Sequence, residues 1–194
     1  TGETIIASDF KVNKEQASSL TDEEVITRSN AKAWVTTTGA NVPITNVDKS
    51  SVKAERGVYP VTLKTAKNTT ITINIIVDYT TDPVVDPVNK ESIIASDFTL
   101  NKDEATNITN EMAISKASAY AWNLTDGASV AITDVDVSNV KVERGVYSVT
   151  FATAKGTSIT VNALVDYNVD PNIDPETGET IIASDFKVNK EQAS

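Results

Sequence analysis

The sequence predicts a mostly β protein that consists of antiparallel β-sandwich domains in tandem. Three observations predict this: an internal repeat, alternation of apolar and polar residues in the longest segments, and turn residues at intervals of about ten. The hexapeptide IIASDF begins at residues 5, 93 and 181, so the period is 88 residues, and residues 3–90 agree with residues 91–178 at 48 of 88 positions without a gap. This period is typical of a small independent domain, since solenoid and propeller repeats have about 20 to 50 residues.

The repeat sets the expected domain boundaries. We expect one domain over residues 1–88, a second over 89–176, and the first strand of a third domain in residues 177–194. This last segment copies residues 1–18 letter for letter. The chain therefore resembles a window from a longer array.

Linkers are expected at residues 80–90 and 168–178. Both contain paired Asp-Pro dipeptides, which disfavour helix in the residue before each proline and favour an extended chain. In an alternative phase, IIASDF would complete the sheet of the preceding unit, and its last copy at 181–186 would then be structural.

The last segment of each unit carries the clearest strand pattern. In residues 70–79, apolar side chains alternate with threonine, asparagine and aspartate. The apolar face consists of Ile71, Ile73, Ile75, Val77 and Tyr79. The preceding segment GVYPVTLKTA alternates in the same way, and AKNT is the hairpin connection between the two. Further strands, all with equivalents 88 residues later, are expected at about 4–12, 32–38, 42–48 and 51–54.

One segment of each unit lacks this alternation. Thr21 and Glu24 have the spacing of a capping box, in which the two side chains bond to the backbone amides at the start of a helix. We therefore expect a short helix near residues 22–30 and another near 110–118.

Six or seven short strands and a short helix in fewer than 90 residues are typical of an immunoglobulin-like (Ig-like) antiparallel sandwich. Trp34 and Trp122 lie at equivalent positions in the middle of expected strands. Because an indole is large and mostly apolar, we expect both tryptophans to be core residues.

The composition excludes most catalytic machinery. With no His and no Cys, the chain has no Ser–His–Asp triad, no Cys–His pair, no zinc site of these residues and no disulfide. The 7 glycines form no phosphate-binding loop. We expect no enzyme, no catalytic residue and no cofactor. The net charge of −10 argues against nucleic-acid binding, and no apolar segment reaches the ~20 residues of a membrane span, so we expect no membrane insertion.

Calcium is a candidate ligand, because it takes several oxygen ligands and binds weakly to many extracellular modules. The candidate ligands are the aspartates in and beside the linkers, namely Asp78, Asp82, Asp86, Asp166, Asp170 and Asp174. Their spacing argues against a shared ion, since carboxylates four residues apart on an extended chain are separated by about 13 Å.

The two units differ in charge more than in apolar pattern. Residues 3–90 carry 10 basic and 11 acidic side chains, a net charge of −1, whereas residues 91–178 carry 5 and 13, a net charge of −8. The duplication keeps the core and varies the surface. This favours a length-setting role over a single electrostatic docking patch.

The segments AKAWVTTTGANVPI and VKAERGVYPVTLKTAKNTTITINIIV, with AYAWNLTDGASVAI and VKVERGVYSVTFATAKGTSITVNALV in the second unit, resemble the bacterial Ig-like repeats of Gram-positive cell-wall-anchored surface proteins. The resemblance implies an extracellular, wall-attached location and a stalk that projects a distal adhesive region, with neighbouring repeats as partners. The alternative is an adhesin module that itself binds a host protein or glycan.

An internal Lys–Asn isopeptide crosslink is a further possibility, since surface-protein sandwiches of this kind sometimes carry one between their first and last strands. The candidate residues are Lys14 with Asn74 and Lys102 with Asn162. Against it, both asparagines are expected on the polar face of the last strand, whereas the reaction needs a buried pair.

Overall fold

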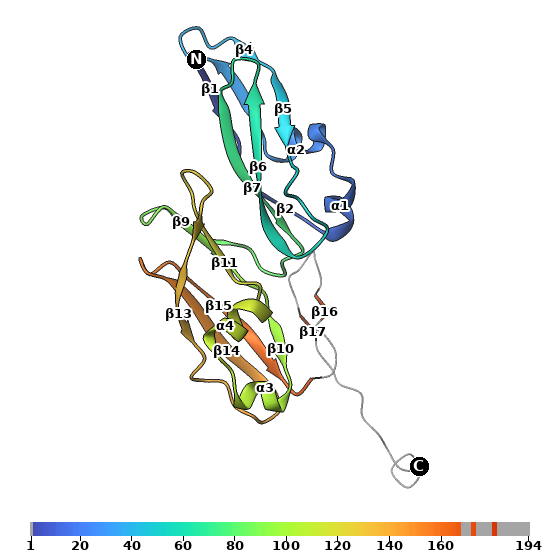
Figure 1. The fold of residues 1–194 in the computed structure, drawn as a ribbon, viewed down its shortest axis with the longest axis vertical. Coiled ribbons are helices and arrows are strands. Elements are labelled where there is room, and N and C mark those ends of the chain that lie inside the picture. Colours follow the sequence, from blue (N-terminus) through green and yellow to red (C-terminus); the bar gives the residue numbers. More distant parts are fainter. Residues whose placement is uncertain (1, 168–171, 174–179, 182–194) are drawn as a thin grey trace.

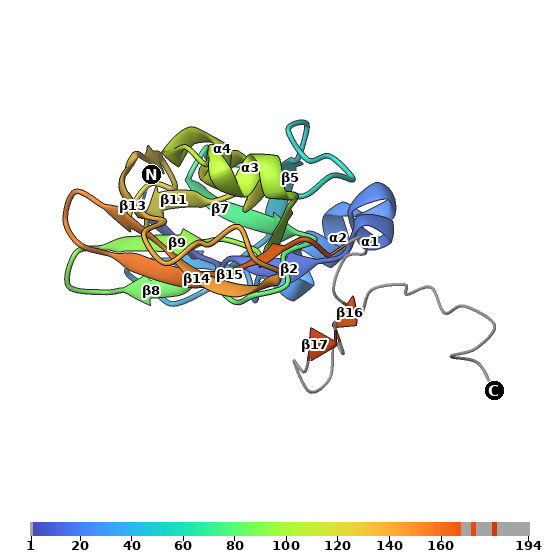
Figure 2. The same cartoon turned by 90° about the horizontal axis from the view of Figure 1, so that it is seen from below.

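The computed structural model describes residues 2–167, 172–173 and 180–181. The protein is mostly β, as the sequence predicts, and Figure 1 shows two units that follow one another along its long axis. Within the described residues, each unit has two sheets and two short helices, and equivalent elements begin 88 residues apart. Figure 2 shows that the helix pairs of the two units face different directions.

The first unit consists of β1 (Glu3–Ile6), β2 (Phe10–Val12), α1 (Lys14–Ser19), α2 (Asp22–Arg28), β3 (Lys32–Val35), β4 (Asn41–Val42), β5 (Ile44–Asp48), β6 (Gly57–Thr65) and β7 (Thr70–Val77). One sheet has the order β1-β3-β4 and the other has the order β2-β7-β6-β5. The antiparallel pairing of β6 with β7 confirms the predicted hairpin.

The second unit consists of β9 (Glu91–Ile94), β10 (Phe98–Leu100), α3 (Lys102–Thr106), α4 (Asn110–Lys116), β11 (Tyr120–Asn123), β12 (Ser129–Val130), β13 (Ile132–Asp136), β14 (Gly145–Thr153) and β15 (Ser158–Val165). Its sheets have the orders β12-β11-β9-β8, in which β8 is Val84–Asp86, and β10-β15-β14-β13. The additional strand β8 (Val84–Asp86) precedes the unit, and β16 (Asn172–Ile173) pairs with β17 (Thr180–Ile181) beyond it.

Each unit has a core of its own. Alternate residues of the β6–β7 hairpin, such as Leu63 and Ile75, are fully buried in the first core, and Phe151 and Ala163 take these places in the second. The other sheet contributes Ile5 in the first unit and Ile93 in the second. The period-two alternation therefore identified the inward face of both hairpins correctly.

The two predicted helices are confirmed as α2 and α4, and a second helix precedes each of them. The capping box of α2 joins Thr21 and Glu24, as predicted. The additional helices α1 and α3 begin after Asn13 and Asn101, whose side chains accept hydrogen bonds from the amides of Gln16 and Glu104. The sequence carries the same N-cap signal there, with asparagine in place of threonine.

The expected strand at residues 4–12 is wrong as a single element. It breaks between Ile6 and Phe10, so β1 lies in one sheet and β2 in the other. Because the chain changes sheets without reversing, β2 runs parallel to β7, and the sheet is mixed rather than purely antiparallel. The strands expected at 51–54 and 139–142 are also wrong, since these residues form turns and irregular chain before the long hairpin.

The linker expected at residues 80–90 contains part of a sheet. Within it, β8 pairs antiparallel with β9, from Val84 opposite Ile93 to Asp86 opposite Glu91. The copy of IIASDF at 93–98 contributes β9 and the start of β10 to the sheets of its own unit, not to those of the preceding unit. The alternative phase is therefore wrong for this copy, whereas residues 182–186 lie outside the described residues.

Candidate functional site at the contact between the two units

The C-terminal half of the outward face of β7 is buried, although the polar residues of this face predict exposure. Asn74 is 1% exposed and Ile76 is 2% exposed, and both alternate with the core residues Ile73 and Ile75. The second unit covers this face, and Figure 1 shows strands of the second unit reaching alongside the first. The contact between the units is therefore the most distinctive site in the described chain.

A small apolar cluster forms the centre of this contact. Four buried residues make up this interunit cluster, namely Ile76, Tyr79, Ile94 and Trp122, and Val58 and Tyr120 pack against it. The Tyr120 and Trp122 rings stack with centroids 6.1 Å apart. Because residues of both units contribute, the cluster ties one unit to the other.

The alternation predicts that Tyr79 lies on the inward face of the first unit. In the structure it does not. Strand β7 ends at Val77, and Asp78 adopts a φ of 60°, in the left-handed region. This turn breaks the period of two, so Tyr79 joins the interunit cluster instead of the core of the first unit.

The expectation that both tryptophans are core residues is confirmed for Trp122, which is buried in an apolar cluster, although between the units rather than inside one, and it is wrong for Trp34. In β11, Ala121 faces the core of the second unit, so Trp122 faces the opposite side, where it is 1% exposed against the first unit. The equivalent Trp34 is half-buried.

A hydrogen bond from the indole crosses the contact. Trp122 Nε1 donates to Asp9 Oδ2 at 3.0 Å, and the other oxygen of Asp9 accepts from the backbone amide of Asn74 at 2.7 Å. Burial raises the pKa of the Asp9 carboxyl above its usual value, while the hydrogen bonds from Asn74 and Trp122 act in the opposite direction. Asp9 therefore fixes the orientation of the indole at the edge of β7.

Further hydrogen bonds join the end of the first unit to the second. The hydroxyl of Tyr79 donates to the carbonyl of Ser118 at 2.5 Å. The hydroxyl of Thr81 donates to the carbonyl of Ala95, and the amide of Thr80 donates to Ser96 Oγ at 3.4 Å. These bonds hold the linker against the second unit, so the relative orientation of the units does not depend on the apolar cluster alone.

The first two calcium candidates form ion pairs with basic side chains. Asp78 pairs with Lys14 at 3.0 Å, and its backbone carbonyl accepts from Arg56 Nε at 2.9 Å. Asp82 pairs with Lys11 at 2.7 Å. These contacts brace the start of the linker against the first unit.

Asp86 and Asp166, the other two calcium candidates that the structure describes, each have protein partners of their own. The carboxylate of Asp86 accepts hydrogen bonds from the side chain and from the backbone N–H of Asn89. The hydrogen bond from the backbone N–H is the largest of the causes that lower the pKa of this carboxyl. Asp166 pairs with Lys102 at 3.4 Å, and Asp170 and Asp174 lie outside the described residues. Within the described part of the chain, no three acidic side chains gather in a way that could hold a metal ion.

The crosslink candidates are not brought together. Lys14 pairs with Asp78, which lies four residues beyond Asn74, or about 13 Å along a strand. In the second unit, Lys102 pairs with Asp166, while Asn162 is exposed and donates from Nδ2 to Asp97 at 3.2 Å. Asn74 is buried, although its place on the polar face predicts exposure. The residues that bury it belong to the second unit and do not include Lys14.

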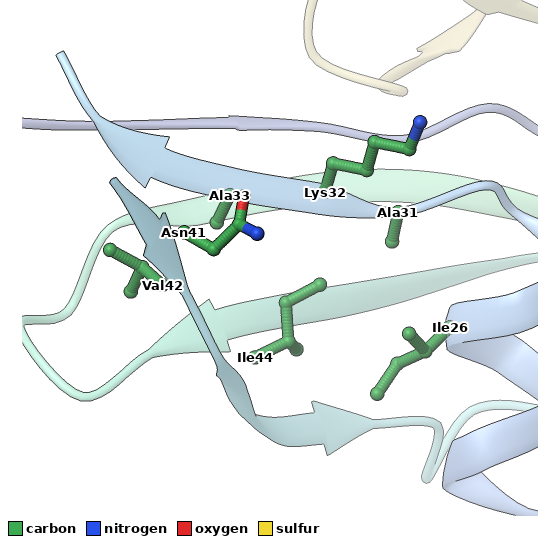
Figure 3. A pocket seen from close by; sticks show the side chains of 7 residues that line it. All are labelled: Ile26, Ala31, Lys32, Ala33, Asn41, Val42 and Ile44. Carbon is green, nitrogen blue, oxygen red and sulfur yellow. The ribbon is translucent and has the colours of Figure 1, made fainter. Parts of the chain in front are cut away.

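A pocket of about 500 Å³ opens on the first unit between α2, β3, β4 and β5 (Figure 3). Its lining residues are Ile26, Ala31, Lys32, Ala33, Asn41, Val42 and Ile44. The wall is mainly aliphatic, with only Lys32 and Asn41 to offer polar side chains. These side chains do not form the nucleophile and base pair that covalent catalysis requires.

No family model and no curated protein matches the chain. Among the described residues, no helix is long and apolar enough to cross a membrane.

Sequence reasoning missed the interunit contact, although the chain carries a signal for it. In a strand that is exposed on one face, apolar and polar residues alternate. By contrast, β7 ends in three consecutive apolar residues, Ile75 to Val77, and β9 contains the apolar pair Ile93 and Ile94. Such runs indicate strands that are buried on both faces. The run at Ile75 to Val77 thus predicts a second layer over β7.

Substitution of Gly127 tests whether the loop after β11 touches the first unit. A Cβ at Gly127 would lie 3.4 Å from Asn74 Nδ2, whereas one at the equivalent Gly39 would meet nothing within 4 Å. Both glycines have a φ of 71°, which asparagine tolerates well. The added Cβ alone would make an ordinary van der Waals contact with Asn74, so any overpacking comes from the rest of the asparagine side chain, which needs room beside the first unit. Gly127→Asn should therefore lower the free energy of unfolding by about 1 kcal/mol, and Gly39→Asn should have little effect in urea denaturation. Equal effects would contradict this contact.

The buried phenol of Tyr79 predicts loss of stability in alkali. Burial is the main cause that raises the pKa of Tyr79 from 10.0 to about 12. Below pH 10 the phenol is neutral in both states, and its contribution to stability is fully present. Between pH 10 and 12 only the unfolded chain ionises, so the free energy of unfolding should fall by roughly 2–3 kcal/mol. Urea denaturation across this range measures the fall.

Tyr79→Phe is the control for this pH dependence, because it keeps the ring and removes the titrating group. At neutral pH it should cost about 1 kcal/mol for the lost bond to Ser118. Its stability should then decline less in alkali than that of the parent. An identical alkaline decline in both proteins would assign the effect to other groups.

Proposed function

We propose that the chain is a structural spacer from the stalk of a bacterial cell-surface protein, and that its units are Ig-like sandwiches that hold a distal adhesive region away from the wall. The observation that carries this proposal is the contact between the units. A spacer gains reach only if successive units keep a defined angle, and the interunit cluster with its crossing hydrogen bonds at Trp122 and Tyr79 supports such an angle.

The linker supports the same role. Residues 80–90 do not form a free tether, because β8 adds to the sheet of the second unit and Asp82 pairs with Lys11 of the first. A linker that is paired on both sides transmits orientation, whereas a glycine- and serine-rich linker would behave as a flexible coil. The extracellular, wall-attached location of this spacer rests on the resemblance to Gram-positive surface repeats.

Small-angle scattering of the chain tests the proposed spacer. Two units of 88 residues, each with a radius of gyration of about 12 Å and with centres about 30 Å apart, give about 20 Å for the pair. A single compact globule of the same length would give about 16 Å. The higher value, with a pair-distance distribution of two lobes, is expected. The lower value would overturn the proposal.

Single-molecule stretching adds a mechanical test. Each unit should unfold as a separate event that lengthens the chain by about 270 Å, which is 88 residues at ~3.5 Å less a folded length of ~35 Å. One event that releases both units together would contradict a stalk of independent modules.

The alternative is an adhesin module that itself binds a host protein or glycan, and it rests on the resemblance alone. A binding screen with the intact chain distinguishes the two functions. Saturable binding that is lost on substitution of exposed side chains of one unit would favour the adhesin module.

A further inference from the structure

The repeated hexapeptide IIASDF crosses from one sheet to the other in each unit. Its first two residues belong to β1 or β9, and its last residue begins β2 or β10. Between them, the amide of Ser8 donates to the carbonyl of Ser29 at 2.9 Å, and the amide of Ser96 donates to that of Ala117 at 2.8 Å. The crossing is thus fixed in the same way in both units, and it places β2 and β10 beside the last strands, β7 and β15.

The strand that follows this crossing runs parallel to the last strand of its unit. In the second unit, Phe98 lies opposite Ala163 and Leu100 lies opposite Val165, and the first unit has the same register 88 residues earlier. The chain enters the unit before β10 and leaves it after β15. Because the two strands point the same way, tension along the chain pulls them in opposite directions along their common axis. The hydrogen bonds between them lie across this axis, so they are loaded together.

An antiparallel pair responds differently when its two adjacent ends are pulled apart. The β14–β15 hairpin is such a pair, since Gly145 at the start of β14 lies opposite Val165 at the end of β15. Tension applied before β14 and after β15 opens the hydrogen bonds of this hairpin one after another from that end. The second unit therefore contains both geometries and allows them to be compared.

The aspartate of the hexapeptide extends the parallel ladder at its upstream end. Asp97 Oδ1 accepts from the backbone amide of Asn162 at 2.8 Å, and Asp9 Oδ1 accepts from the amide of Asn74 at 2.7 Å. Each carboxylate takes the place of a backbone carbonyl, and it is the stronger acceptor of the two. The aspartate therefore adds a hydrogen bond to the last strand in both units.

Two further contacts extend the ladder at its downstream end. The amide of Asp166 donates to the carbonyl of Leu100 at 2.8 Å, and the amide of Asp78 donates to that of Val12 at 2.9 Å. The side chains of the two aspartates also pair with the first residues of α3 and α1, at 3.4 Å and 3.0 Å. Because these ion pairs are partly exposed, we expect the backbone bonds to resist most of the tension.

From these observations we propose that β2 with β7, and β10 with β15, form mechanical clamps that hold each unit closed when the chain is pulled from both sides. Asp9 and Asp97 are members of these clamps through their bonds to the last strands. The clamps deepen the proposed spacer function, and their use at a cell surface rests on that function. As a property of the fold they have their own readout, because forced unfolding depends on the rate of unfolding.

The direction of pulling tests the clamp of the second unit in the full chain. Because the chain has no cysteine, one introduced cysteine sets where the force enters, and the C-terminus is the other handle. Val88→Cys, at a position 88% exposed before β9, loads β10 against β15. Glu143→Cys, at an exposed position before β14, opens the β14–β15 hairpin from its ends. The first geometry should need a force at least about twofold higher at equal loading rate, because its bonds break together.

Asp97→Ala tests the aspartate of the motif in the Val88→Cys protein. The unfolding force should fall, because the bond to the amide of Asn162 is lost. Val135→Ala is the matched control, since Val135 is buried in the same core but lies on β13, which pairs with β14 and not with the clamp. Urea denaturation measures the equilibrium stability of both variants. For an equal loss of stability, Asp97→Ala should lower the force more than Val135→Ala.

Equal forces in the two pulling directions would overturn the proposal, whether or not Asp97→Ala folds. Equal effects of the two alanine substitutions at matched stability would exclude Asp97 from the clamp. The spacer function fails on a different observation. Two units that unfold separately at low force would form a spacer without clamps, whereas one event that releases both units would contradict the spacer and leave the contrast between pulling directions to stand.

Discussion

Replacement of Trp122 by alanine is expected to lower the free energy of unfolding by about 3–5 kcal/mol and to release the second unit from the first. The indole is 1% exposed at the centre of the interunit cluster, and its loss leaves a cavity beside Ile76 and Tyr79. It also removes the N–H that Asp9 accepts. Urea denaturation measures the energy, and scattering should show a broader distribution of distances between the units.

Trp34→Ala is the matched control, because Trp34 occupies the equivalent position in the first unit but is only half-buried. It should cost less, about 1–2 kcal/mol, and should leave the distance distribution of a dilute sample unchanged. Equal losses from the two substitutions would mean that Trp122 stabilises its own unit rather than the contact.

Phe151→Ala should selectively unfold the second unit. Phe151 is fully buried in the core of that unit, and truncation of a core phenylalanine typically costs about 3–5 kcal/mol. For a domain of this size, the melting temperature of the second unit should fall by roughly 15 °C or more. Calorimetry should then show two separate transitions, and hydrogen exchange should show that the first unit loses protection only near the outward face of β7.

Leu63 is the equivalent residue of the first unit and is also fully buried, so Leu63→Ala should reverse the pattern. The substitution should lower the free energy of unfolding of the first unit by about 2–5 kcal/mol, and only the calorimetric transition of that unit should shift. A single transition that shifts as a whole in both variants would show that the units fold as one body, and the spacer proposal would lose its modular basis.

Much of the local structure could be predicted because it depends on neighbours in sequence. The period of two in residues 70–77 placed Ile73 and Ile75 in the core, and the spacing of Thr21 and Glu24 identified α2. Each of these signals arises from one strand or one helical turn. The same reasoning applied to Asn13 and Gln16 would have identified α1 as well.

The candidate site was not predicted, because its partners lie far apart in sequence. Asp9 and Trp122 are separated by 113 residues, and no local sequence pattern around either residue predicts that they are in contact. The aspartates of the linker suggested calcium ligands, yet Asp78 and Asp82 lie beside Lys14 and Lys11, which the fold brings back from the start of the unit. The sequence therefore singled out aspartates that do make specific contacts, but their partners are lysines of the first unit and not a calcium ion.

The sequence by itself determined that this protein is a tandem of near-duplicate β units, because an 88-residue period and alternating strands are properties of the chain that need no knowledge of its path. Only the tertiary structure decided which apolar residues serve each unit and which join the units. Consecutive residues of a strand point to opposite faces, so Ile75 fills a core while Ile76 meets the neighbouring unit. What covers the second face depends on how two separately folded units pack together.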